Sequence, residues 1–495
     1  MSSPVLDEAA RIAQQFDYPA AEVQRGVAEY IREMEEGLAK EGTTLSQIPT
    51  FVTEVPNGTE KGLYLAVDLG GTNFRVCSID LHGDNTFSLT QSKIMIPREL
   101  MAAGTSKDLF LFLARQIEAF LRIHHNDHFE AHLLRCREGS KREELFDLGF
   151  TFSFPVRQLG INKGTLIRWT KGFDIPDAVG QDVCALLQDA INDLDLPVRV
   201  AALVNDTVGT LMARSYTSPD EHGTLLGAIF GTGTNGAYVE KLDKIKKMDS
   251  FDTYDDYDKS TGEMVINAEW GSFDNHLSVL PNTKYDQELD ADSNNPGVQM
   301  FEKRVSGMFL GEILRRALLD MHRNESVNLF KPSETSDVEV PENSGIYKQW
   351  GIDTSFLSIV EKDKSAGREQ TKTALSDHLR IQRPSDTDCQ AVQILVHAIG
   401  KRAARLSAVP LGAILISTGK LKKDELVDIG VDGSLVEFYP YFEGYIRDTL
   451  KELPEIGAEG EKKVRIGISK DGSGVGAALI ALVAAKEDAA KEKVL

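Results

Sequence analysis

The chain has 495 residues, 41% of them hydrophobic and 26% charged, and it carries a net charge of −21 at pH 7. This length exceeds what one ordinary hydrophobic core supports, so the chain is expected to divide into two or more domains. A strongly acidic protein repels nucleic-acid phosphates and anionic lipids, and the composition therefore argues against a nucleic-acid partner and against a membrane surface.

The first part of the chain predicts helices and has no targeting signal. Residues 5–40 place apolar side chains at helical spacing among Glu and Arg, which predicts one or two amphipathic helices. No basic-then-apolar signal region precedes them, and the longest nearly apolar run, residues 474–485, is shorter than the roughly 20 residues that a membrane helix needs. The four cysteines form no Cys-x-x-Cys pair. We therefore expect a reduced, cytoplasmic protein.

Strands and helices then alternate along the chain. The turn-rich residues 49–62 precede two strands within LYLAVDLGGTNFRVCSIDLHGDN (63–85), and TFSLTQSKIMIP predicts a third. A helix is expected at about 106–123, followed by a polar loop or short helix. LFDLGFTFSFPV (145–156) predicts a strand, and VRVAALVNDTVGTLMARSY (198–216) predicts a buried strand that leads into a helix. This alternation indicates an α/β architecture.

The second half continues the alternation. LLGAIFGTGTNGAYVEKL (225–242) predicts two strands around a glycine turn, and a helix at about 389–408 is expected before a strand, LGAILIS (411–417). The last unit, VRIGISKDGSGVGAALIALVAAK (464–486), predicts a strand, a glycine turn and a helix. Three acidic or Asn-, Gly- and Pro-rich segments are expected to be loops: 243–262, 282–297 and 331–346.

Two glycine turns share the string Gly-Thr-Asn, at Gly71–Asn73 and at Gly233–Asn235, and each lies between two apolar strands. We favour duplication of a phosphate-binding hairpin over coincidence. Such small residues allow a bulky anion to approach the backbone amides. The turns are not equivalent, because Asp68 of the first corresponds to Phe230 of the second. Asp68 could hold Mg²⁺ through water, or could only cap its turn.

Known nucleotide-binding motifs are mostly absent. The chain has no GxxxxGK[ST] segment of a Walker-type NTPase and no HRD and DFG pair of a protein kinase. Residues 472–477, GSGVGA, match the loose dinucleotide fingerprint after a strand, but no second parallel strand and no ribose-binding acid follow them. The remaining interpretation is a glycine-opened helix, whose amino end allows a phosphate or a ribose to approach.

Polar side chains follow several of the predicted buried strands. Asn205 and Asp206 end one of them, where a carboxylate is costly unless it caps the next helix or takes part in chemistry, and both interpretations remain open. Read alone, Glu302 fits a solvated helix face. Carboxylates and amides paired with hydroxyls are the chemistry that holds small neutral carbohydrates. The further candidates are Ser153, Thr170, Lys171 and Glu269.

Eight motifs in succession resemble the signatures of the hexokinase family, over about residues 20–485. They are LAVDLGGTNFRV, LGFTFSFP, RWTKGF, NDTVGT, FGTGTNGAY, INAEWGSF, FEKRVSGMFLGE and DGSGVGAAL. The segments VPNGTE and GAEGEKKV are most similar to fungal glucokinases. The resemblance implies an actin-like ATPase fold, in which two ribonuclease-H-like α/β domains lie around a cleft. It implies a small domain of residues 62–205 plus 476–495 and a large domain of residues 1–61 plus 206–475.

The resemblance also implies roles for individual residues. Asp206 matches the catalytic base, Lys171 faces the transferring group, and Asp68 would hold Mg²⁺. The positions matching the hexose site are Ser153, Thr170, Lys171, Asn205, Asp206, Asn235, Glu269 and Glu302. The positions matching the ATP site are Asp68, Gly70, Gly71, Thr72 and Asn73 in the first loop, Gly231, Thr232, Gly233 and Thr234 in the second, and Ser417, Gly419, Gly433, Ser434, Gly472 and Ser473 on the adenosine side.

The implied reaction is transfer of the γ-phosphoryl group of MgATP to the 6-hydroxyl of glucose and related aldohexoses, the first step of glycolysis. ATP and Mg²⁺ are the implied cofactors, and a monomer or weak dimer is expected. A non-catalytic hexose sensor is the alternative, but a sensor needs no base such as Asp206. An actin-like filament subunit would leave the acids and amides around Asp206 without a purpose. Motifs do not distinguish glucose, mannose and fructose.

Overall fold

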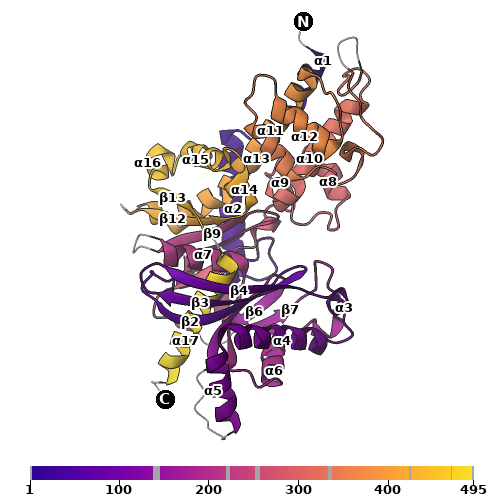
Figure 1. Cartoon of the computed structure of the whole chain (residues 1–495). Coiled ribbons are helices and arrows are strands. Elements are labelled where there is room, and N and C mark those ends of the chain that lie inside the picture. The colour runs from indigo at the N-terminus through magenta and orange to yellow at the C-terminus, as the bar shows by residue number, and fades with distance from the viewer. Residues whose placement is uncertain are drawn as a thin grey trace.

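The computed structural model describes residues 3–137, 145–218, 223–250, 257–332, 337–422, 425–469 and 471–492. Two β-sheets organise the fold, one above the other in the view of Figure 1, and helices surround both. The first helix, α1 (Pro4–Gln14), and the last, α17 (Ala477–Glu492), lie toward opposite ends of the molecule (Figure 1). No helix within these ranges is both long enough and apolar enough to cross a membrane.

The two sheets share one strand order. In the five-stranded sheet, the order is β4 (Phe87–Met95), β3 (Asn73–His82), β2 (Lys61–Leu69), β5 (Phe146–Phe152) and β8 (Val198–Val204). In the six-stranded sheet, it is β1 (Ile48–Pro49), β11 (Glu263–Asn267), β10 (Thr234–Lys241), β9 (Thr224–Phe230), β12 (Val427–Asp432) and β13 (Val464–Ile468). When the strands of each sheet are numbered along the chain and β1 is left out, both sheets have the order 3-2-1-4-5. This shared order supports the duplication that the glycine turns suggested.

Each sheet joins an antiparallel hairpin to parallel strands. β2 pairs antiparallel with β3 and parallel with β5, and β5 pairs parallel with β8. Likewise, β9 pairs antiparallel with β10 and parallel with β12, which pairs parallel with β13. A small ribbon of β6 (Val156–Gly160) and β7 (Lys163–Leu166) follows β5. The fold is therefore the expected α/β architecture.

Helices cover both faces of the five-stranded sheet, called the smaller sheet below; the six-stranded sheet is the larger one. α4 (Ser106–His124) and α6 (Val183–Asn192) pack against one face, where Leu65, Val67 and Leu148 belong to their core. α17 contacts β2, β5 and β8 from the other face. A Cβ at Gly149 of β5 would lie 2.1 Å from the carbonyl oxygen of Ala477, so a glycine is required for this close approach.

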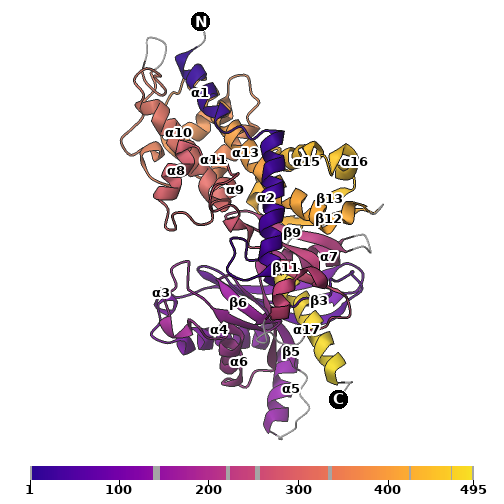
Figure 2. The same cartoon turned by 180° about the vertical axis from the view of Figure 1, so that it is seen from behind.

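Helix α7 (Asp206–Thr217) lies between the sheets. It follows β8 of the smaller sheet directly, and it packs on β9, β10 and β12 of the larger one. Beyond the larger sheet, α13 (Asp386–Thr418) packs against α1, α2 (Ala20–Ala39), α10 (Gly307–Arg323) and α15 (Phe442–Glu452). Figure 2 shows α2 as a long helix beside β9 and β11. The remaining α-helices are α3 (Arg98–Met101), α5 (Asn126–Arg137), α8 (Lys284–Ala291), α9 (Glu302–Val305), α11 (Thr354–Lys362), α12 (Glu369–Leu379), α14 (Ser434–Phe438) and α16 (Gly457–Glu461).

Two expectations about secondary structure are wrong. Residues 411–417 are not a strand but the last turns of α13, which runs through Pro410 to Thr418. A short apolar run does not separate a buried strand from a buried helix, and here the run packs against helices, with Gly412 beside Leu453 and Val27. Residues 282–297 are not only a loop, because they contain α8, which Thr283 and Asp286 open with a capping box.

The other helices and strands lie close to their expected positions. The helices within residues 5–40 and at about 106–123 are α1, α2 and α4. The polar stretch after α4 forms α5, and its last residues, 138–144, lie outside the described residues. Periodicity and glycine turns thus located these elements, whereas amphipathic helices such as α10 and α15 were not predicted.

A buried ion pair joins α8 to α13. Arg402 donates from Nη1 and Nη2 to the two carboxylate oxygens of Asp286, at 2.7 and 2.8 Å, and the side chains are 0% and 1% exposed. Burial would by itself raise the pKa of Asp286, but the Arg402 guanidinium outweighs it and lowers the pKa to about 2. The pair therefore keeps its charge inside the protein.

We expect Arg402→Met to lower the free energy of unfolding by about 3–5 kcal/mol, because it leaves the buried Asp286 charge without its ion-pair partner. Urea denaturation of the two proteins measures this difference. The control is Arg11→Met, which breaks the exposed Arg11–Glu8 pair on α1 and should cost at most about 1 kcal/mol. Equal losses in the two variants would contradict this account of the buried pair.

Candidate active site

The parallel strands of the smaller sheet bring three predicted site segments to one edge. Asp68 of β2 lies beside Thr151 of β5, which lies beside Val204 of β8. Ser153 and Asp206 follow within two residues of these strand ends. Ligands of open α/β sheets bind at the carboxyl ends of parallel strands, so this edge is where a site is expected.

Asn205 and Asp206 open α7. The Asn205 side chain caps the helix by accepting from the backbone N–H of Thr207 at 2.9 Å, so the capping interpretation holds for this residue. Asp206, the first helical residue, also accepts from the Thr207 N–H, through Oδ1 at 2.9 Å. Its other oxygen, Oδ2, accepts from no group of the described chain and remains available to a ligand.

The amides and acids predicted to bind hexose cluster on the larger sheet. Asn235 Nδ2 donates to Asn267 Oδ1 at 2.8 Å and to Glu269 Oε1 at 3.2 Å, and Asn267 Nδ2 donates to Glu269 Oε1 at 2.8 Å. Asn235 Nδ2 also lies 3.5 Å from the hydroxyl of Thr207 on α7, which joins the cluster to the Asp206 helix. Asn267 belongs to this cluster although the sequence had not singled it out. Its place at the end of β11, two residues before Glu269, was the available signal.

Both glycine turns leave backbone N–H groups open to a ligand. In the first turn, the Thr72 carbonyl faces Ile96, because it accepts from the Ile96 N–H at 2.9 Å. The Thr72 residue is exposed. In the second, Thr232 is exposed, but Thr234 is buried and its hydroxyl accepts from the Trp270 indole N–H at 3.0 Å. The Thr234 hydroxyl is thus committed to the core, and the two exposed hydroxyls are those of Thr72 and Thr232.

Lys171 lies beside the first turn and the acids. Its Nζ donates to the Ser153 carbonyl oxygen at 2.7 Å and lies 5.3 Å from the centre of the Phe154 ring. Burial lowers the pKa of Lys171, while Asp206, Asp68 and Glu302 act in the opposite direction. These four side chains therefore lie close enough for their charges to interact. Trp169, two residues before Lys171, packs against Phe152, Phe154 and Phe173 in the aromatic core.

The environment of Asp206 prepares it to accept a proton. Burial, together with the neighbouring Glu269 and Asp68, raises the pKa of Asp206 to about 6, while Lys171 and the Thr207 N–H act in the opposite direction. Burial likewise raises the pKa of Glu269 and of Glu302. At neutral pH, a carboxylate with a pKa near 6 is mostly ionised yet basic enough to take a proton from an alcohol that is losing it.

Four of the six residues predicted on the adenosine side lie beside these groups. A Cβ at Gly231 would lie 3.4 Å from Gly433 Cα and 3.7 Å from Ser434 N, so the end of β12 adjoins the second turn. Thr151 Oγ1 donates to Ser473 O at 2.8 Å, and a Cβ at Gly472 would meet α7 at 2.8 Å from Thr210 Cα.

Ser417 and Gly419 do not lie there. The Ser417 carbonyl accepts from Lys244, and the neighbouring Lys420 pairs with Glu263 at 3.2 Å. Glu263 pairs with Lys241 at the far end of β10 from Thr234, roughly 23 Å away at about 3.3 Å per residue. Because residues 411–417 continue a helix, the chain after them lies near the ends of the strands that are opposite to the candidate site.

Arg75 is a second residue that the sequence did not single out. From β3, it pairs with Asp68 Oδ2 and with Asp471 Oδ1, each at 3.4 Å, and it hydrogen-bonds the Ser473 hydroxyl. It therefore links the first turn to the turn before α17. Its place five residues after Gly70, on the strand that leaves the turn, was the signal for it.

Asp68 fits the predicted Mg²⁺ position by its chemistry. Its carboxylate is partly exposed and pairs through Oδ2 with Arg75. Within the described ranges, no three His, Cys, Asp or Glu side chains are arranged to hold a metal together. A single carboxylate with space around it suits an ion that keeps most of its water shell, as Mg²⁺ does.

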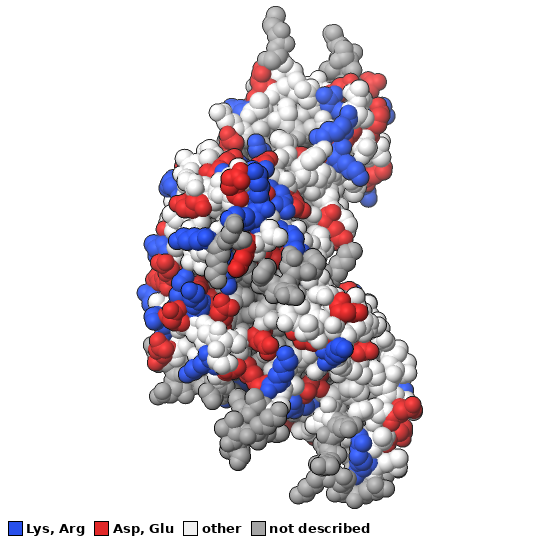
Figure 3. All heavy atoms as spheres, turned by 90° about the vertical axis from the view of Figure 1, so that its left-hand side faces the viewer, with Lys and Arg blue, Asp and Glu red and all other residues white. Residues whose placement is uncertain are grey.

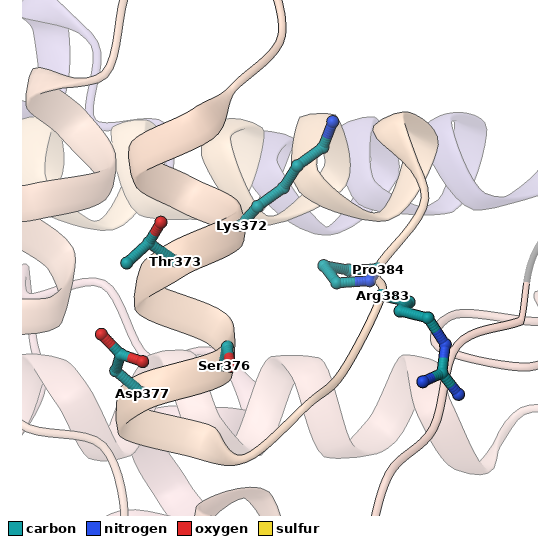
Figure 4. A pocket seen from close by; sticks show the side chains of 6 residues that line it. All are labelled: Lys372, Thr373, Ser376, Asp377, Arg383 and Pro384. Carbon is teal, nitrogen blue, oxygen red and sulfur yellow. The ribbon is translucent and has the colours of Figure 1, made fainter.

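The outline of the molecule is indented between its upper and lower parts (Figure 3). A separate surface pocket of about 480 Å³ lies between α12 and the start of α13 (Figure 4). Its two cations already pair with acids, Lys372 with Asp386 at 2.8 Å and Arg383 with Glu339 at 3.4 Å. None of the predicted site residues lines this pocket, which lies outside the candidate active site.

Comparison with known proteins agrees with this arrangement. Hexokinase family models match residues 8–216 and 225–483. Glucokinase of Aspergillus niger is 78% identical over 490 residues, which cover 99% of each chain, and Glucokinase-1 of Saccharomyces cerevisiae is 45% identical over 97% of each. The solved structure of hexokinase from Schistosoma mansoni complexed with glucose has a TM-score of 0.76 and 34% identity, and it covers 96% of this chain and 98% of that one.

The fold is the actin-like ATPase fold, with two α/β domains built on the same strand order. The chain belongs to the hexokinase family and is an enzyme of the hexokinase and glucokinase type.

The raised pKa of Asp206 makes stability depend on pH. Because the folded protein holds this proton more tightly than the unfolded chain, the stabilisation is present below about pH 4 and is lost as the pH rises through 6. Between pH 5 and pH 8, we expect wild type to lose about 1 kcal/mol more free energy of unfolding than Asp206→Asn, which cannot ionise. Urea denaturation without ligands measures this.

The matched control is Asp193→Asn at an exposed position, which should follow wild type across the same pH range. Parallel pH dependence of wild type and Asp206→Asn would contradict the raised pKa.

Proposed function

We propose that the protein transfers the γ-phosphoryl group of MgATP to the 6-hydroxyl of glucose and of related aldohexoses. The observation that carries the proposal is the place of Asp206: a carboxylate with a raised pKa, one free oxygen, and Lys171, Asp68 and Glu269 within electrostatic reach. The 78% identity to Aspergillus niger glucokinase over nearly the whole chain supports the same reaction.

On the sugar side, this cluster of amides and acids would position the hexose. Asn205, Asn235, Glu269 and Glu302, together with Ser153, Thr170 and Lys171, pair with its hydroxyls so that the 6-hydroxyl meets Asp206 Oδ2. As the oxygen attacks phosphorus, Asp206 takes the hydroxyl proton and becomes neutral. Correct alignment of attacking oxygen, phosphorus and leaving oxygen supplies most of the catalysis, because phosphoryl transfer has a loose transition state.

On the nucleotide side, backbone N–H groups of the two glycine turns would bind the phosphate oxygens, and Gly433, Ser434, Gly472 and Ser473 would adjoin the adenosine. Lys171 and Thr232 face the transferring group. Bound Mg²⁺ would neutralise charge on the phosphates, with Asp68 holding it through water. Arg75, already paired with Asp68, adds a positive charge beside the first turn. An acidic protein can bind ATP here because the local donors are backbone amides and a few cations.

Water is a competing nucleophile, so the site should close only on sugar. We place the small domain at residues 62–205 plus 476–495 and the large domain at residues 1–61 plus 206–475, with hinges near Asp206 and Gly472. Closure would exclude water and complete the site around the hexose.

Asp206→Ala should lower kcat by at least about 10²-fold, the usual contribution of a general base, while glucose binding remains detectable. The wild-type kcat/KM should rise with pH through about 6, because Asp206 must be ionised to accept the proton. Coupled ADP-release assays with and without glucose measure both. The control is Ser417→Ala, at the far end of the sheet, which should leave kcat and the KM for ATP unchanged.

Lys171→Met should cost less than Asp206→Ala if Mg²⁺ carries most of the charge stabilisation, and a larger loss would reverse that ranking. Equal activity of wild type and Asp206→Ala would remove Asp206 from the mechanism. Glucose binding without glucose-stimulated ADP release in wild type would instead favour a sensor.

Glucose should reduce the radius of gyration measured by small-angle X-ray scattering, because closure brings the domains together. The control is xylose, a pentose that lacks the 6-hydroxymethyl group, and it should reduce the radius less. An unchanged radius at saturating glucose would contradict sugar-induced closure.

A further inference from the structure

The segment from Glu302 to Met308 holds the second glycine turn at three points. Glu302 Oε2 accepts from the backbone N–H of Thr234 at 3.0 Å. At the start of α10, Gly307 N–H donates to Gly231 O at 2.7 Å, and Met308 N–H donates to Thr232 O at 3.2 Å. One short stretch of chain therefore fixes both ends of the turn.

These contacts determine which way the turn presents its polar groups. The carbonyls of Gly231 and Thr232 face α10, so the N–H groups of Thr232 and Gly233 have no hydrogen-bond partner within the described chain. They are the groups that an anion could use. The position of Glu302 thus bears directly on how these donors are oriented.

Glycine makes the contact with Glu302 possible. A Cβ at Gly233 would lie 2.8 Å from Glu302 Oε2, closer than a side chain tolerates. Gly307 is similar, because a Cβ there would lie 3.0 Å from Gly231 O. Two glycines on opposite sides of the contact indicate that the turn and the segment 302–308 are built to approach each other.

Glu302 has a second oxygen. Oε1 accepts from no group of the described chain, whereas Oε2 is committed to Thr234. The carboxylate lies within electrostatic reach of Glu269 and Asp206. A hexose hydroxyl that donates to Oε1 would therefore bind the same carboxylate that holds the phosphate turn.

We infer that Glu302 couples hexose binding to nucleotide binding: a sugar bound at Oε1 fixes the carboxylate, and the carboxylate fixes the turn through Oε2. This inference rests on the proposed function. A carboxylate already ordered by sugar leaves less ordering for the nucleotide to complete, so the sugar should tighten nucleotide binding. Thermodynamic linkage requires the reciprocal effect of the same size.

The experiment measures the dissociation constant of the Mg²⁺ complex of a non-hydrolysable ATP analogue by calorimetry, without glucose and at saturating glucose. For wild type, we expect the ratio of the two constants to lie within the roughly 5- to 150-fold range of typical couplings. Glu302→Gln keeps one oxygen as an acceptor for the Thr234 N–H but replaces the other, the proposed acceptor for the sugar, by an amide nitrogen. Its ratio should fall to within about 2-fold of unity.

The matched control is Glu269→Gln, which weakens the sugar site and meets the turn only at the Asn235 side chain, not at its backbone N–H groups. Once saturated with glucose, it should keep the wild-type ratio. Gly233→Ala is a second probe, because its methyl group separates the turn from Glu302; it should lower the ratio while glucose affinity without nucleotide is unchanged.

A wild-type ratio in Glu302→Gln, or an equal loss in Glu269→Gln, would overturn the inference. If Glu302→Gln does not fold, a wild-type ratio in Gly233→Ala overturns it as well. A wild type that binds both ligands and releases ADP but has a ratio of one contradicts the coupling alone. A wild type that binds no glucose contradicts the proposed function itself.

Discussion

The active-site arrangement depends on a contact between two stretches of backbone that only glycine permits. Gly209 lies on α7 one turn after Asp206, and a Cβ there would lie 2.4 Å from the carbonyl oxygen of Gly472. A Cβ at Gly476 would lie 2.2 Å from Gly209 Cα. With no side chain between them, α7 lies directly on the turn that leads into α17. The end of β8, the Asp206 helix and the last segment of the chain are therefore packed directly against one another.

The other end of α7 is held by charge. Arg214 donates to both carboxylate oxygens of Asp428 on β12, at 2.8 and 2.7 Å, and Arg465 of β13 pairs with the same carboxylate. Gly430 and Gly467 leave the space that the Arg214 side chain fills. Because α7 follows a strand of one sheet and is bound to two strands of the other, a movement between the sheets must act on Asp206. If the domains close as proposed, α7 would transmit their movement to Asp206, the proposed base.

The sequence could predict the parts of the site that local patterns encode. Local sequence patterns predict the glycine turns between apolar strands. They also predict the acids at strand ends, such as Asp68 and Asp206. The parallel pairing of β2, β5 and β8 then brings the ends of these strands together. Contacts between distant segments left no such pattern. Arg75 resembles an ordinary strand residue until Asp471 and Ser473 arrive beside it, and the roles of Asn267 and of the Thr234 hydroxyl depend on packing. Ser417 was assigned from the family resemblance, and the structure places it at the end of α13, away from the other predicted nucleotide-binding residues.

The two glycine turns show how a duplicated element acquires two different uses. Both keep Gly-Thr-Asn and open N–H groups, but their acids come from different places. The first turn has its own acid, Asp68, at the end of the preceding strand, where a cation can share it with a phosphate. The second has Phe230 at that position, buried against Trp270, and receives an acid from a distant helix instead, Glu302. An acid from another segment can hold the turn through one carboxylate oxygen and offer the other oxygen to a different ligand, as Glu302 does here with Oε2 and Oε1. The acid that holds the second turn therefore comes from outside it, which is the arrangement that the proposed coupling of sugar and nucleotide requires.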